Sequence, residues 1–328
     1  MARQQKTFLE LLPQLFLFPL LIVTVCVLVW LLFIASAQDN RSAEELVSDL
    51  QSGGSHGRKQ DAYALALKAR ELSQDGQYFS ADVTRQLLAF VARERQLAED
   101  PEFLEFLVMA VGRAGDPAQS VPVMTGLALD PATPPQARIW AVRALGLSGA
   151  STAGSSLLLV LASHREAGDW EFRWNALAGL VNLRSPAAVE HLRRALQETR
   201  RELRWSAACW LAMTYSDGEG RSVLEDLTDW AFLDQQMGED SNQLTLQQKE
   251  KYMMMALEGL VRLDGRGALP LLKAKREERR SPGVQDLVLR LIGNLEESEP
   301  ASLAPRSVAP AFGIGSAPVR RSTLDLVA

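Results

Sequence analysis

Apolar and polar residues divide the chain into three stretches of different pattern. Residues 15–37 contain no charged side chain. Across residues 58–298, short apolar stretches recur at the three- and four-residue spacing of amphipathic helices, and Gly, Pro and Asp turn signals separate them. Residues 299–328 are rich in Pro, Ala, Ser and Gly without a helical period. The pattern predicts one apolar helix, an array of helices and a disordered tail.

A recurring frame of arginine, alanine and leucine organises the middle stretch. It reads R-x-x-A-x-x-x-L and is intact in three copies: Arg138/Ala141/Leu145, Arg173/Ala176/Leu180 and Arg204/Ala207/Leu211. About seven units result, since looser copies begin at Arg58, Leu104, Met253 and Gln285. The alanine and leucine lie four residues apart and so share one helix face, where a small residue permits close helix approach and a large one fills the gap. The frame therefore indicates helix packing.

A second amphipathic stretch follows the turn after five of the frames. These stretches are residues 118–129, 153–163, 187–199, 222–233 and 268–277. Neither helix of such a hairpin can bury its apolar stripe alone, so neighbouring hairpins must stack around a continuous core. Because few segments show the period of two that strands require, we predict an all-α protein, an α-solenoid of about seven helical hairpins.

The apolar stretch at residues 15–37 is long enough to cross a hydrocarbon core of about 30 Å as a helix. It predicts a transmembrane helix ahead of the array, with residues 1–37 as the N-terminal segment and anchor. Residues 38–57 then form a juxtamembrane linker with one amphipathic helix at residues 43–50. The alternative is a cleaved secretory signal, because a basic N-terminal region precedes the stretch and Ala35-Ser36-Ala37 fits a cleavage site.

Composition and charge argue against several classes of function. The net charge of −5, from 35 basic and 40 acidic residues, gives no electrostatic footprint for nucleic acid. The three histidines have no cysteine or carboxylate at ligand spacing. The sequence also lacks a P-loop and a dinucleotide-binding glycine motif. We therefore predict a protein that is not an enzyme and that has no cofactor, metal or nucleic-acid partner.

The segment DWEFRWNALAGLVNLRSPAAVEHLRRALQE resembles a HEAT-like repeat of the phycobilisome-lyase type, with its frame helix, short turn and A-x-x-x-L second helix. This resemblance covers about residues 58–295 and implies a HEAT-like array. The order of apolar stretch, linker and array is similar to bacterial membrane-anchored HEAT-repeat proteins, which implies a bacterial origin. HEAT-like arrays serve as scaffolds, adaptors, lyases and glycosylases, so the resemblance is specific for fold and weak for function.

Positive charges near the ends of the apolar stretch set the expected orientation. Arg3 and Lys6 precede it, whereas Arg41 is the clear basic residue after it. Because positive charge favours the cytoplasm, we expect a single-pass protein of the bacterial inner membrane whose repeat array lies outside the cytoplasm. A cleaved signal would place the array on the same side.

These features favour a membrane-tethered scaffold or adaptor that binds a membrane-associated protein partner in the groove of the array and contacts lipid through residues 15–37. An accessory subunit of a membrane complex and a HEAT-like lyase are the alternatives. In HEAT-like arrays the second helices usually line the concave surface. The candidate partner surface is therefore the polar side of two of them: Glu190, Arg193, Arg194, Gln197, Glu225, Asp226 and Asp229. Simple solvation of each side chain is the other interpretation.

Arginines and aromatic residues of the frame helices are expected to be structural. Arg138, Arg173 and Arg204 stand where the helix dipole disfavours a cation, so a carboxylate or carbonyl of a neighbouring repeat should pair with each. Cys209 is expected to be a small buried residue rather than a reactive thiol. Four tryptophans should fill the seams between repeats, with a ligand cage as the alternative: Trp140, Trp174, Trp205 and Trp210.

Overall fold

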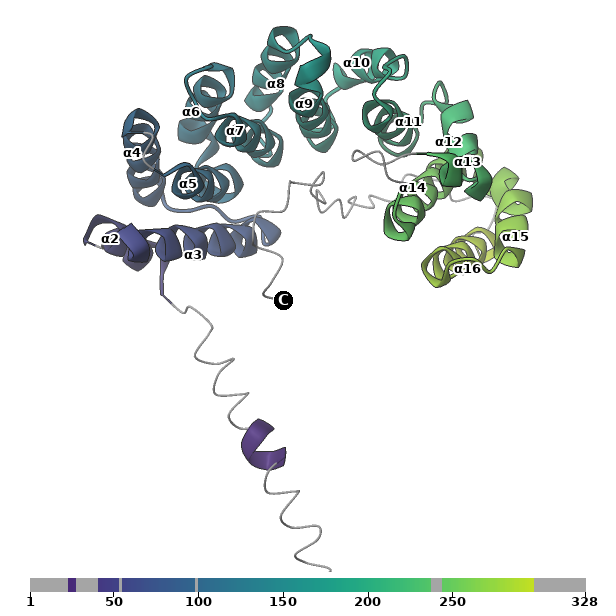
Figure 1. Ribbon diagram of the computed structural model, residues 1–328, viewed down its shortest axis with the longest axis horizontal. Helices are drawn as coiled ribbons and strands as arrows, with labels where there is room; N and C mark the ends of the chain where they lie inside the picture. Colours follow the sequence, from purple (N-terminus) through teal and green to yellow (C-terminus); the bar gives the residue numbers. More distant parts are fainter. Residues whose placement is uncertain (1–22, 28–40, 53–54, 98–99, 237–243, 298–328) are drawn as a thin grey trace, which may run out of the picture. The chain divides into compact units, whose positions relative to one another are not determined.

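The computed structural model describes residues 23–27, 41–52, 55–97, 100–236 and 244–297. Every regular element in these ranges is helical, which confirms the predicted all-α fold for this part of the chain (Figure 1). The elements are α2 (Ala43–Ser52), α3 (Ser55–Gln74), α4 (Ala81–Leu97), α5 (Pro101–Ala114), α6 (Pro117–Leu129), α7 (Pro135–Leu147), α8 (Thr152–Ser163), η1 (Ala167–Asp169), α9 (Trp170–Asn182), α10 (Ala188–Ala195), α11 (Arg201–Tyr215), α12 (Arg221–Leu227), α13 (Trp230–Gln235), α14 (Leu246–Asp264), η2 (Gly265–Ala268), α15 (Leu269–Glu277) and α16 (Pro282–Glu297).

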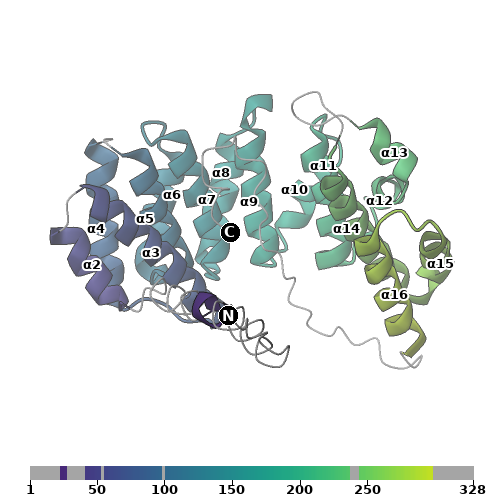
Figure 2. The ribbon, with the colours of Figure 1, turned by 60° about the horizontal axis from the view of Figure 1, so that its bottom comes forward.

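The chain divides into two compact units, Met1–Tyr215 and Ser216–Ala328. In the first unit α3, α5, α7, α9 and α11 pack in sequence as one layer, and α2, α4, α6, α8 and α10 form a second layer (Figures 1 and 2). The layer that carries the frame lies on the inner side of this unit's curve. In the second unit α14 and α16 carry the frame, and α12 and α15 pack against them.

Alanine and leucine positions of the frame form the core, as predicted. In the three intact copies all six of these side chains have an exposed fraction of 0%. The equivalent positions of the four looser copies are buried as well. Removing a large aliphatic side chain from water contributes about 1.5–3 kcal/mol, so the repetition of the frame accounts for why the hairpins stack.

Glycines bring neighbouring frame helices of the first unit into backbone contact. A Cβ atom on Gly146 of α7 would lie 2.4 Å from the Cα of Gly179 in α9. A Cβ atom on Gly112 of α5 would lie 2.1 Å from the Cβ of Ala144 in α7. No side chain fits at such distances, because non-bonded carbon atoms prefer about 3.5–4.0 Å. This close approach in one layer curves the first unit toward that layer (Figure 1).

The range predicted as a juxtamembrane linker holds a helix that belongs to the first unit. α2 confirms the amphipathic helix expected at residues 43–50, and it buries Leu46, Val47 and Leu50 against α3 and α4. The Nη1 of Arg41, just before α2, forms an ion pair with Oδ1 of Asp61 in α3 at 2.8 Å. The stacked helices therefore begin before Arg58.

The predicted membrane anchor requires a correction. Across the described ranges, no helix combines the length and apolar character needed to cross a membrane. Of residues 15–37 the structure describes residues 23–27, which are helical. The remainder of that stretch lies outside the described residues, as does the predicted tail at 299–328. The prediction of a single-pass membrane protein with its array outside the cytoplasm is therefore wrong.

Candidate functional site

Arginines that open the intact frames tie each frame helix to a chain segment beside it. The Nε of Arg138 donates to the carbonyl of Ala128 at 3.2 Å, and Nη1 of Arg204 donates to the carbonyl of Glu198 at 2.7 Å. The Nη1 of Arg173 pairs with Oε1 of the same Glu198 at 2.6 Å. The expected partner in a neighbouring repeat is thus confirmed for Arg138 and Arg204, whereas Arg173 pairs within its own hairpin.

Tryptophans of α9 and α11 fill the seam between these two helices, as predicted. The indole Nε1 of Trp174 donates to Oγ of Ser206 at 2.9 Å, and its ring centroid lies 5.6 Å from that of Trp210. Trp205 and Cys209 are buried in α11. These contacts leave a packing role for the aromatic residues and for the cysteine.

Arg143 forms a buried polar contact between α7 and α9. Its Nε donates to Oδ1 of Asn175 at 2.7 Å, and the guanidinium lies over the Trp140 ring, 4.7 Å from the centroid. Burial lowers the pKa of Arg143, and the nearby charge of Glu171 opposes that shift. Nδ2 of Asn175 donates in turn to the Glu171 carbonyl at 2.7 Å. The group fixes the two helices relative to one another.

Three residues of the predicted partner surface lie on α10, and the fourth, Gln197, lies in the turn after it. Glu190, Arg193, Arg194 and Gln197 are all exposed, and Oε1 of Glu190 pairs with Nη2 of Arg194 at 3.0 Å. Burial lowers the pKa of the neighbouring His191, and the charge of Arg194 lowers it further. However, α10 lies in the outer layer of the first unit (Figure 1). The expectation that second helices line the concave side is wrong there, because the glycine contacts place the frame helices inside.

The other three predicted residues lie on and after α12, in the second unit. Glu225 and Asp226 are exposed, and Oε1 of Glu225 pairs with Nη1 of Arg221 at 3.3 Å. Asp229 precedes α13, where its Oδ1 accepts a hydrogen bond from the backbone N–H of Ala231 at 2.9 Å. Asp229 is therefore a helix cap, and the predicted surface consists of two patches on separate units.

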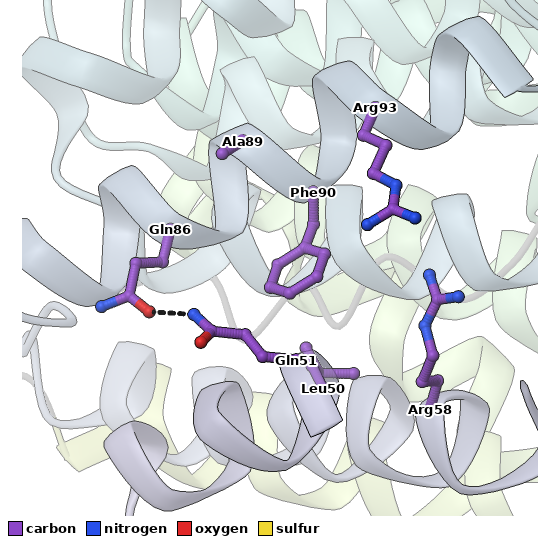
Figure 3. Close-up of a pocket in the computed structure, with 7 residues that line it drawn as sticks. All are labelled: Leu50, Gln51, Arg58, Gln86, Ala89, Phe90 and Arg93. Carbon is purple, nitrogen blue, oxygen red and sulfur yellow. Dashed lines mark hydrogen bonds between the residues drawn. The ribbon is translucent and has the colours of Figure 1, made fainter. Parts of the chain in front are cut away.

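A cavity of about 480 Å³ opens between α2, α3 and α4 (Figure 3). Arg58 and Arg93 point toward one another at one end, with the Phe90 ring between the helices. At the other end Nε2 of Gln51 donates to Oε1 of Gln86 at 2.8 Å. The remaining lining residues, Leu50 and Ala89, are apolar. Its size is within the range of small-ligand sites, and its lining favours an anion beside an apolar group.

The charge of this cavity is nevertheless modest. Nη2 of Arg58 pairs with Oε1 of the buried Glu94 at 2.5 Å, and its guanidinium lies over the Phe103 ring, 4.7 Å from the centroid. Within the described ranges, no hydrogen bond or ion pair engages the exposed Arg93. A single solvated arginine attracts an anion weakly. In the same ranges, no three His, Cys, Asp or Glu side chains gather as metal ligands would.

Comparison with known proteins bears on the repeat. Residues 172–198 match the family model described as PBS lyase HEAT-like repeat. The matched segment extends from α9 through the turn into α10, the segment on which the sequence resemblance rests. No curated protein matches the chain. The match supports a HEAT-repeat protein with a helical solenoid fold, while a bacterial origin stays a prediction.

Proposed function

We propose that the chain is a protein-interaction scaffold, in which stacked hairpins present side chains from several helices to one protein partner. The HEAT-like match supports this proposal, since such repeats form extended binding surfaces. A partner can contact several neighbouring helices at once because each hairpin presents equivalent positions. The proposal assigns the chain no reaction of its own.

The observation that carries the proposal is the in-register packing of frame helices. Residues that are 43 positions apart meet side by side on α3 and α5: Nζ of Lys59 donates to Oε2 of Glu102 at 3.2 Å, and the Tyr63 and Phe106 ring centroids lie 5.4 Å apart. Such packing aligns exposed side chains of successive helices into stripes. A stripe of this kind suits the recognition of a partner segment that runs across or along the helices.

We propose a second contact surface on α10 and the turn after it, with Glu190, Arg193, Arg194 and Gln197 as its residues. Glu225, Asp226 and Asp229 are proposed as a separate acidic patch. Mixed charge on such surfaces favours selectivity and association rate more than affinity.

Affinity capture with the full chain, followed by titration of each recovered protein in purified form, tests the proposal. We expect a partner that binds stoichiometrically, with affinity that falls on the order of tenfold, about 1.4 kcal/mol, when Arg194→Glu reverses a charge on α10. Arg85→Glu is the matched control, because Arg85 of α4 is as exposed as Arg194 and also pairs with a carboxylate on its own helix. Absence of any stoichiometric partner, or turnover of a substrate by the purified chain, would contradict the proposal.

A further inference from the structure

Two neighbouring helices of the first unit carry the same pair of features in register. Tyr63 of α3 meets Phe106 of α5 edge to face, with ring centroids 5.4 Å apart. Seven residues later on each helix stand Arg70 and Arg113, which are close enough that the charge of Arg70 lowers the pKa of Arg113. The spacing of seven residues is two helical turns, so both features lie on the same face, about 10 Å apart.

The aromatic end is exposed. Tyr63 is 46% exposed, and Leu67, one turn later on the same face of α3, is 43% exposed. The buried Asp61 and Leu65 of the frame lie on either side of Tyr63 in sequence, so Tyr63 projects from the opposite face of the helix, away from the outer layer. Two large exposed side chains with Phe106 beside them form an apolar patch on the inner side of this unit.

Neither arginine at the other end has a counter-ion among the described residues. Arg113 is half-buried, and burial is the larger cause of its lowered pKa, with the charge of Arg70 second. Within the described ranges, no hydrogen bond or ion pair engages either guanidinium. The end of α5 supplies partial negative charge to Arg113 but does not satisfy the donors of two guanidinium groups. Two like charges at a partly desolvated site destabilise each other unless an anion neutralises them.

We propose that Tyr63, Leu67, Arg70, Phe106 and Arg113, which we name the α3–α5 surface, bind an acidic amphipathic helix of a partner protein. An apolar side chain of that helix packs against Tyr63, Leu67 and Phe106. A carboxylate two turns further along lies between the two arginines, which supply charge-assisted hydrogen bonds. The inference rests on the proposed scaffold function and names the chemistry of one partner-binding surface.

The position of the surface favours a helix over a bilayer. α3 and α5 belong to the layer on the inner side of the first unit's curve (Figure 1). A flat membrane contacts a hollow face poorly, whereas a helix about 10–12 Å wide can lie along it. The apolar patch is also what separates this surface from a simple phosphate site, because inorganic phosphate gains nothing from Tyr63 and Leu67.

Selection of helical peptides from a random library displayed on phage, against the full chain, tests this inference. We expect the enriched peptides to carry an acidic residue about two turns from an apolar pair. Binding of a selected peptide, measured by fluorescence anisotropy, should weaken on the order of tenfold, about 1.4 kcal/mol, in Arg113→Gln and in Tyr63→Ser. Arg85→Glu, on an exposed position of α4, should bind as the unchanged chain does, and circular dichroism should show that all variants are folded.

Other outcomes would overturn the inference in distinguishable ways. Enrichment of peptides without an acidic residue would contradict the proposed role of the α3–α5 surface, and so would equal binding of a selected peptide to Arg113→Gln and to the unchanged chain. The scaffold proposal would still stand if a partner binds elsewhere. Strong competition by inorganic phosphate alone would reassign the arginine pair to a phosphate site. Binding of phosphatidylserine vesicles that Arg70→Glu abolishes would reassign it to lipid. If no peptide is enriched and no partner is captured, both proposals are contradicted. If a partner is captured but no peptide is enriched, only the role of the α3–α5 surface is contradicted.

Discussion

Replacing Gly146 of α7 by alanine is the sharpest test of how the first unit is built. In most exposed helices this change stabilises the protein by about 0.8–1.0 kcal/mol, since alanine is the better helix former. Here the new methyl would lie 2.4 Å from the Cα of Gly179 and 3.4 Å from its backbone nitrogen. Backbone cannot rotate away as a flexible side chain can, so α7 and α9 must separate by about 1 Å or more to restore ordinary contact.

The cost of this separation exceeds the gain in helix propensity. Overpacking of a close-packed interface costs about 1–3 kcal/mol, and a clash with backbone belongs at the upper end, so we expect a net destabilisation of about 2 kcal/mol. Gly126→Ala in α6 is the matched control, because nothing lies within 4 Å of its added Cβ, and it should stabilise by up to about 1 kcal/mol. Urea unfolding followed by circular dichroism measures both. A Gly146→Ala protein as stable as Gly126→Ala would refute the backbone contact.

Three further predictions concern buried or capped positions. Ala176→Asp puts a charge at a fully buried frame position, so it should cost about 3–5 kcal/mol, and an unchanged melting temperature would contradict the frame. Burial raises the pKa of Tyr215 to about 12, above about 10 in the unfolded chain, so its stabilisation is complete below about pH 10 and is lost as pH rises toward about 12. Tyr215→Phe should remove that pH dependence of the urea midpoint. A variant with the same pH profile as the unchanged chain would refute the assignment to Tyr215. Asp229→Ala should cost about 1 kcal/mol through the lost cap of α13, whereas a stability equal to that of the unchanged chain would leave only a surface role.

Sequence periodicity predicted the core well because the alanine and leucine positions of the frame are the buried positions of each helix. Ala141, Leu145 and their equivalents are small or large according to how near the next helix lies, and a spacing of four residues places both on one face. Which layer faces inward depends instead on which helices approach more closely. Gly112, Gly146 and Gly179 all lie in frame helices, so the sequence does carry that signal, whereas the expected concave side rested on the usual arrangement of HEAT-like arrays.

The α3–α5 surface was missed for a different reason. Tyr63 and Arg70, like Phe106 and Arg113, are seven residues apart, yet each pair alone is unremarkable in a helix. Only the offset of 43 residues between the two helices brings the four side chains together, and that offset depends on the length of α4 and its turns. The cavity beside α2 was missed because α2 was assigned to a linker rather than to the stack.

The glycine contacts also determine in which direction the first unit can bend. The backbones of α7 and α9 already touch at Gly146 and Gly179, so the spacing between these inner helices cannot decrease further. In the outer layer, by contrast, an added Cβ atom on Gly126 of α6 or Gly154 of α8 would meet nothing within 4 Å. The contact prevents any closer approach of α7 and α9. Bending of this unit is therefore one-sided, because the inner helices can spread apart and flatten the curve but cannot approach one another further.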